Sequence, residues 1–129
     1  MSSELDALLD LLQAERRRIV LELLSALQLE QESADVTVQV QDLARQVAAA
    51  EADVDSPTVG KTVRRLSNVG LRHTHLPILH DYGIIKYNPD ANEVSTTNRT
   101  RTVAQIMRNI VATVEDTEIG LAQSPNIDS

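Results

Sequence analysis

Hydrogen-bond donors gather on one face of a helix that the sequence predicts over residues 56–81. Ser56 and Pro57 are favoured residues at a helix N-cap and first turn. At about 100° per residue, the donors between residues 58 and 75 fall in a narrow stripe. This stripe consists of Lys61, Arg64, Arg65, Asn68, Arg72 and His75. The opposite face, which we expect to pack on the core, consists of Val59, Val63, Leu66, Gly70 and His73. Such donors can reach phosphates and base edges in the major groove of DNA.

The alternative is an ordinary solvated helix face without a partner. Two observations favour the DNA interpretation over it. The chain has a net charge of −7, yet no acidic residue lies between Pro57 and His80. Residues 28–56, in contrast, carry seven acids and only one base, Arg45. An acidic protein with one basic segment is typical of a chain that uses that segment to bind a polyanion.

The three histidines of this region raise the alternative of a metal site. His73 and His75 point apart on a helix, and His80 lies two turns beyond His73. No carboxylate is placed to complete a set of ligands. We therefore expect no metal and no cofactor, with His73 and His80 packing on the core and His75 facing solvent or phosphate.

The composition restricts the class of protein. The 129 residues include no Cys, Phe or Trp and only two Tyr, so the core must be aliphatic and no disulfide can form. Asp and Glu far outnumber Lys, as in the proteins of halophiles, where net charge maintains solubility in salt. We find neither a secretory signal nor an apolar run of about 20 residues, and we expect a cytoplasmic protein.

Hydrophobic periodicity predicts a mainly α-helical fold with a small β-hairpin. We expect helices over residues 3–13, 15–27, 40–51, 56–81 and 100–121, a strand at 36–38, and a hairpin of strands 84–87 and 93–96. Gly83 should end the long helix. Arg16, Arg17 and Arg18 begin the second helix and oppose its dipole, so we expect acidic or phosphate neighbours and favour pairing with acids of the first helix. A hairpin after a long helix is typical of a winged helix-turn-helix, in which the contacts of the hairpin with DNA would come from Lys86, Arg99 or Arg101.

The last helix carries an apolar seam with alternating spacings of four and three. The seam consists of Val103, Met107, Ile110, Val114, Thr117 and Leu121, with Ile106 beside it. Such spacing predicts either packing on the helix's own domain or a dimer contact. We favour the dimer, which would place two recognition helices about 34 Å apart on a near-palindromic operator. The expected organisation is a DNA-binding domain at 1–97, a dimerisation helix at 98–122 and a flexible tail at 123–129.

Residues 73–79 (HTHLPIL) and 81–87 (DYGIIKY) resemble a winged-helix family that is widespread in haloarchaea. The chain is more distantly similar to the ArsR and PadR repressors, and the resemblance covers residues 5–94. It implies transcriptional regulation, with His75 and the preceding positions, including Thr74, at the DNA surface. Ile78 stands where the family usually has Lys, and Gly70 replaces a better helix former.

The sequence therefore predicts a sequence-specific regulator that binds double-stranded DNA as a homodimer. The alternative is a winged-helix module that binds a protein or a small ligand without binding DNA. The sequence contains no nucleophile–base pair, phosphate-binding loop or set of metal ligands, so we do not expect an enzyme.

Overall fold

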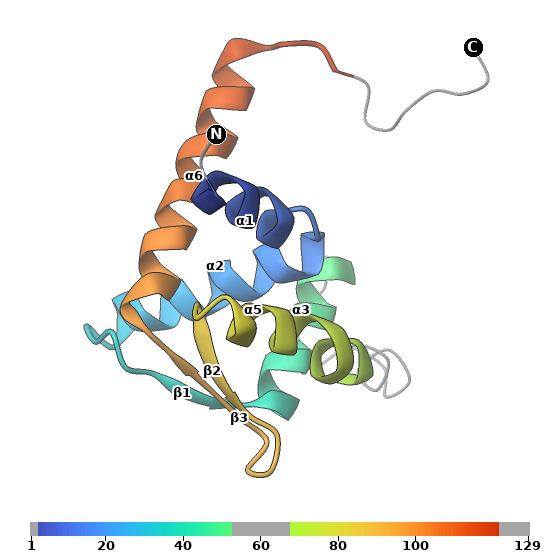
Figure 1. Ribbon diagram of the computed structural model, residues 1–129, viewed down its shortest axis with the longest axis vertical. Helices are drawn as coiled ribbons and strands as arrows, with labels where there is room; N and C mark the ends of the chain where they lie inside the picture. Colours follow the sequence, from blue (N-terminus) through green and yellow to red (C-terminus); the bar gives the residue numbers. More distant parts are fainter. Residues whose placement is uncertain (1–2, 53–67, 122–129) are drawn as a thin grey trace, which may run out of the picture.

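The computed structural model describes residues 3–52 and 68–121, which form a mainly helical fold with one small antiparallel sheet (Figure 1). In chain order the elements are α1 (Ser3–Leu12), α2 (Glu15–Glu30), β1 (Thr37–Gln39), α3 (Val40–Ala52), the π-helical segment η2 (Leu71–His75), α5 (Leu76–Asp81), β2 (Ile85–Asn88), β3 (Glu93–Thr96) and α6 (Asn98–Thr117). This order confirms the predicted class, mainly helical with a hairpin. The predicted start of the long helix lies outside the described residues. None of the helices in the described ranges combines the length and apolarity needed to cross a membrane.

The hairpin is completed to a three-stranded sheet of order β1-β3-β2, in which both pairings are antiparallel. The central strand contributes Val94, which pairs with Val38 on one side and Tyr87 on the other and is fully buried. Directly before β1, the backbone N–H of Val36 donates to Oγ1 of Thr96, the last residue of β3, at 2.9 Å. The sheet therefore ties the chain between α2 and α3 to the hairpin, at the lower edge of the molecule in Figure 1.

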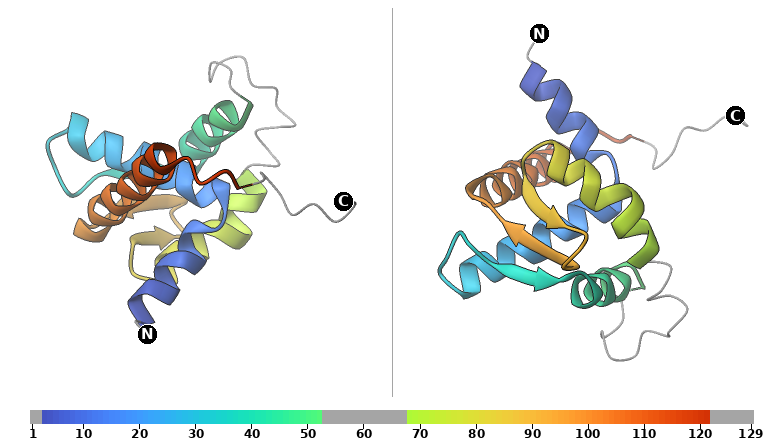
Figure 2. Two further views of the ribbon diagram at one scale, coloured as in Figure 1. Left: turned by 90° about the horizontal axis from the view of Figure 1, so that it is seen from above. Right: turned by 60° about the horizontal axis from the view of Figure 1, so that its bottom comes forward.

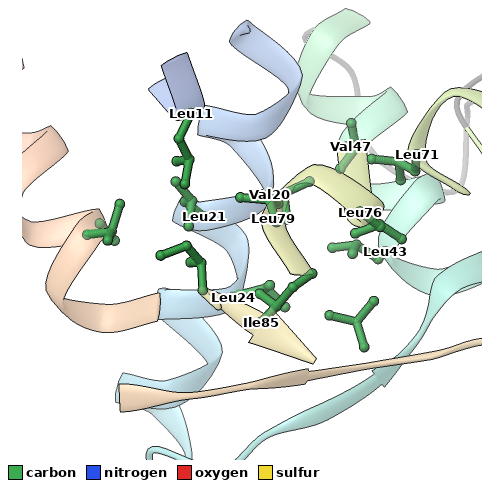
Figure 3. Packing of buried hydrophobic residues seen from close by; sticks show 14 of the residues in the cluster. Leu11, Val20, Leu21, Leu24, Leu43, Val47, Leu71, Leu76, Leu79 and Ile85 are labelled. Atoms are coloured by element: carbon green, nitrogen blue, oxygen red, sulfur yellow. The ribbon is translucent and has the colours of Figure 1, made fainter. Parts of the chain in front are cut away.

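The core is aliphatic, as the composition predicts (Figure 3). Val20, Leu21 and Leu24 of α2 lie at its centre with no exposed surface. They pack with residues from α1, α3, η2, α5, β2, β3 and α6. Each buried Leu or Val contributes about 1.5–3 kcal/mol through removal of its apolar surface from water. One continuous cluster therefore holds the helices and the sheet together.

Gly83 ends the helix before the hairpin through its left-handed backbone, with φ of 74°. Its N–H donates to the carbonyl of His80 at 2.9 Å, and the N–H of Ile84 donates to that of Leu79 at 3.0 Å. These are the two hydrogen bonds of a Schellman motif, and the accompanying apolar contact is supplied by buried Ile84 and Leu79. The angle between α5 and the hairpin is thus set by local backbone chemistry.

Helix α6 begins and ends earlier than the sequence analysis predicts. Thr97 is its N-cap and forms a capping box with Thr100, whose hydroxyl also donates to the carbonyl of Ile84. The helix ends at Thr117, because Glu118 adopts a left-handed conformation. Leu121 therefore lies beyond the helix, so the predicted seam does not reach it as a helical face.

The apolar seam of α6 divides between two environments. Val103 and Met107 are buried against the chain's own core, which corrects their assignment to a dimer interface. Ile106, Ile110 and Val114 are instead 37–47% exposed. Only the first half of the helix packs on the domain, and the second half extends away from the sheet (Figure 1).

Candidate nucleic-acid interface

The helical stretch from residue 68 to 81 is anchored on its inner side by leucines. Leu71, Leu76 and Leu79 have no exposed surface. In Figure 3, Leu71 and Leu76 lie beside Leu43 and Val47 of α3. This anchoring fixes the helix on the core and leaves its opposite side free for contact with a partner.

Arg72, His73 and Thr74 are consecutive exposed residues on that opposite side. Arg72 and Thr74 therefore lie where the sequence analysis expects them, whereas His73 was expected in the core and is exposed. Asn68 is only partly exposed. The described part of the predicted stripe is thus shorter than expected, with Arg72 as its charged centre. Three predicted members, Lys61, Arg64 and Arg65, lie outside the described residues.

The difference in helical phase has its origin in the π-helical segment. The N–H of Leu76 donates to the carbonyl of Leu71, five residues earlier, instead of four residues earlier as in an α-helix. The wider turn contains one more residue, so a projection at a constant angle fails across it. As a result Leu71 is buried, while His73 turns outward.

Arg17, at the start of α2, reaches His75 from inside the domain. Its guanidinium donates to the carbonyls of Leu11 at 2.7 Å and Asp10 at 2.8 Å, and Nη1 lies 3.2 Å from Nδ1 of His75. The side chain is 4% exposed. The last carbonyls of a helix have no hydrogen-bond partner within that helix, and Arg17 supplies donors to two such carbonyls of α1. Because arginine has no acceptor, Nδ1 of His75 must be the unprotonated nitrogen.

The neighbouring arginines, Arg16 and Arg18, also join the start of α2 to other helices. Arg18 donates to the carbonyl of Leu12 at 2.5 Å. Arg16 forms two parallel hydrogen bonds with Glu51, both 3.1 Å long. The predicted pairing with acids of the first helix is therefore wrong: Arg17 and Arg18 bind main-chain carbonyls of α1, and Arg16 binds an acid at the end of α3.

His75 is half-buried, so the expectation that it faces solvent or phosphate is wrong for the ring nitrogen that binds Arg17. Burial lowers the pKa of His75, and the positive charges of Arg17 and Arg16 lower it further, against a smaller opposing effect of Glu51. The ring is therefore neutral at neutral pH and acts as an acceptor that fixes the end of the π-helical segment.

We expect the free energy of unfolding to depend on the protonation of His75. Because its folded pKa lies below the ordinary value of 6.5, the unfolded state binds the proton more readily, and stability falls as the pH drops below about 6.5 towards the folded pKa. His75→Asn retains an acceptor but cannot titrate, so its unfolding free energy should vary less over this window. Urea unfolding at a series of pH values measures the slope. Thr74→Asn should retain the wild-type slope, and an equally steep slope in His75→Asn would contradict the assignment.

The hairpin carries little positive charge. Lys86 is exposed on the edge strand β2, on the side opposite to buried Ile85. The turn beyond it contains Asp90, and Glu93 accepts a hydrogen bond from Gln39 at 3.2 Å. Lys86 is therefore the one cation available on the hairpin, and the main positive charge belongs to the helix.

One hydrogen bond joins the hairpin to the helix, and a second joins the end of the helix to α1. The backbone N–H of Tyr87 donates to Nδ1 of His80 at 3.1 Å, and the hydroxyl of Tyr82 donates to the carboxylate of Asp10. His80 is exposed, so its predicted packing role is wrong, and it acts as an acceptor instead. The hydrogen bond between Tyr87 and His80 thus fixes the hairpin, which carries Lys86, against the helix that carries Arg72. Figure 2 shows the hairpin and this helix side by side.

Comparison with known proteins identifies a family. No curated protein and no solved structure matches the chain. The family model described as "Domain of unknown function (DUF7344)" matches residues 9–95, more than half of the chain. The match extends from α1 to β3 and includes Arg17, Arg72 and Lys86. The chain therefore belongs to the DUF7344 family.

Proposed function

We propose that this protein is a winged-helix regulator that binds double-stranded DNA as a homodimer, with the helix at residues 68–81 in the major groove. The observation that carries the proposal is the outward row of Arg72, His73 and Thr74 on a helix whose opposite side is locked into the core. Exposed donors on a rigid helix are suited to contact phosphates and base edges without further ordering of the protein.

The elements around this helix support the proposal. A three-stranded sheet with a hairpin directly after the helix is the arrangement in which a wing lies beside a recognition helix. Lys86 on the hairpin would contact the flanking phosphate backbone. The acidic turn at Asp90 makes base reading by the tip of the hairpin unfavourable, so sequence preference would come from the helix.

Fluorescence anisotropy with labelled promoter fragments from the genome of the source organism tests the function. We expect wild-type protein to bind some fragments at least tenfold more tightly than a shuffled fragment of equal length and composition. Potassium chloride should be varied in the titration, because affinity from phosphate contacts falls steeply with salt. Equal affinity for all fragments would refute a sequence-specific regulator. No affinity at all would favour a winged-helix module that binds a protein or a small ligand.

A further inference from the structure

The second half of α6 continues the apolar stripe of its first half beyond the edge of the domain. Val103 and Met107 fill the core, and Val111 follows one turn after Met107 on the edge of the stripe that faces α2, whereas Ile110 and Val114 lie beside Ile106. Ile110, Val111 and Val114 are 42–47% exposed, and all residues from 108 to 121 are exposed. An apolar stripe that outlasts its own domain is typical of a helix that packs on another molecule.

A groove of about 530 Å³ lies beside this part of the helix, between α2 and α6. Its aliphatic lining comes from both helices and from the end of α3 and consists of Ile19, Leu23, Ala50, Met107, Val111 and Ala112. Its charged lining consists of Glu15, Arg18, Glu22, Arg108 and Glu115. An apolar groove with charges of both signs is suited to an amphipathic helix.

The charges on α6 identify which helix fits. Arg108 and Glu115 are seven residues apart, so they lie on the same side of the helix, with Val111 and Ala112 midway between them. A two-fold axis beside this midpoint would bring Arg108 of each copy against Glu115 of the other. Glu115 forms no ion pair within the described part of the chain, whereas Arg108 also reaches Glu22 at 3.3 Å. This face is therefore complementary to itself in antiparallel orientation.

We propose that the groove between α2 and α6 is filled by α6 of a second copy of this chain, running antiparallel about a two-fold axis beside Val111 and Ala112. Each copy covers Ile19 and Leu23 of the other. The contact is a crossing of the two protruding half-helices and differs from a seam that runs from Val103 to Leu121. This inference names the interface of the homodimer proposed above and rests on that part of the proposed function.

Charge reversal with complementation tests the pairing. Arg108→Glu places two acids against each other at both ends of the interface, and Glu115→Arg places two bases there. Each variant alone should dimerise at least about tenfold more weakly than wild type. An equimolar mixture should recover dimerisation, because both pairs are again of opposite sign in the heterodimer. Native mass spectrometry with one variant carrying a mass tag measures the heterodimer, and sedimentation equilibrium measures the dissociation constants.

The complementation also separates the interface from a folding defect. Arg108→Glu removes the ion pair with Glu22 within the same chain, and mixing cannot restore it. Recovery in the mixture therefore reports contact between copies. If the heterodimer forms no better than either homodimer, the pairing of Arg108 with Glu115 is wrong.

Cross-linking provides an independent geometric test. The chain has no cysteine, so Val111→Cys introduces a single thiol beside the proposed axis. Oxidation by air with copper–phenanthroline should convert most of this variant to a disulfide-linked dimer. Asn109→Cys, exposed on the other side of α6, is the matched control and should remain largely unlinked. Equal cross-linking of the two variants would overturn the proposed orientation.

The outcomes distinguish this interface from the proposed function. A wild-type chain that stays monomeric at 100-fold the concentration used for DNA binding overturns the interface, and the groove is then left to another occupant. If DNA binding is sequence-specific but neither test succeeds, only the interface fails. If both tests succeed and no DNA is preferred, the regulator proposal fails and the interface stands.

Discussion

Arg72→Glu is expected to abolish measurable sequence-specific DNA binding. Arg72 is exposed at the centre of the outward row of donors, and within the described residues it has no ion pair to occupy it. A contact of this kind is worth about 1–3 kcal/mol, and a homodimer makes it twice, which corresponds to a loss of roughly 100-fold or more. Anisotropy titrations with the preferred promoter fragment measure the loss.

The control for Arg72→Glu is Arg101→Glu, which makes the same change of charge on the exposed side of α6. Its affinity should fall far less than that of Arg72→Glu, since an exposed charge outside the helix at residues 68–81 would at most contact the flanking phosphate backbone. The milder Arg72→Ala identifies the type of contact. If Arg72 contacts phosphate, the salt dependence should weaken; if it contacts a base, the preference among fragments should relax. Equal losses in Arg72→Glu and Arg101→Glu would contradict a specific role for Arg72.

Arg17→Met is expected to destabilise the fold by about 2–5 kcal/mol. Methionine keeps the apolar part of the arginine side chain but has no hydrogen-bond donor. The carbonyls of Asp10 and Leu11 therefore lose their buried donors, and each unsatisfied carbonyl costs about 1–3 kcal/mol. Nδ1 of His75 loses its partner as well. For a chain of this size the melting temperature should fall by roughly 10 °C or more. Urea unfolding and thermal melting, both followed by far-UV circular dichroism, measure the change.

Arg17→Lys should lie between wild type and Arg17→Met, because lysine keeps the charge but cannot form the planar fork that reaches three acceptors. Arg101→Met is the matched control, since it makes the same replacement at an exposed position and should change stability by less than about 0.5 kcal/mol. A stability of Arg17→Met equal to that of this control would refute the structural role of Arg17.

The elements that the sequence predicts well are those set by neighbouring residues. The stop at Gly83 follows from a glycine that can adopt positive φ, and the hairpin follows from β-branched runs around turn formers. The aliphatic core and the inward face of α3, which includes Leu43 and Val47, likewise follow from composition and periodicity. The outward position of Arg72 is also local, because it lies one residue from the buried Leu71.

Other features depend on contacts between distant segments, and there the sequence misleads. A run of three arginines indicates an exposed surface, yet Arg17 is buried because α1 ends beside it with unsatisfied carbonyls. The phase of the helix around His73 changes because of the π-helical turn, which periodicity does not reveal. The stripe of α6 has one regular spacing, yet the domain edge divides it between the core at Val103 and the exposed surface at Val114.

The two tyrosines make the candidate interface spectroscopically visible. With no tryptophan in the chain, all intrinsic emission comes from Tyr82 and Tyr87, which lie on either side of the turn at Gly83. The hydrogen bond from the Tyr82 hydroxyl to Asp10 raises the pKa of Tyr82, and we expect the carboxylate beside the phenol to quench its emission. Tyrosine fluorescence of the unlabelled protein should therefore report locally on how the helix and α1 are joined, and it should brighten when the hydrogen bond between Tyr82 and Asp10 breaks.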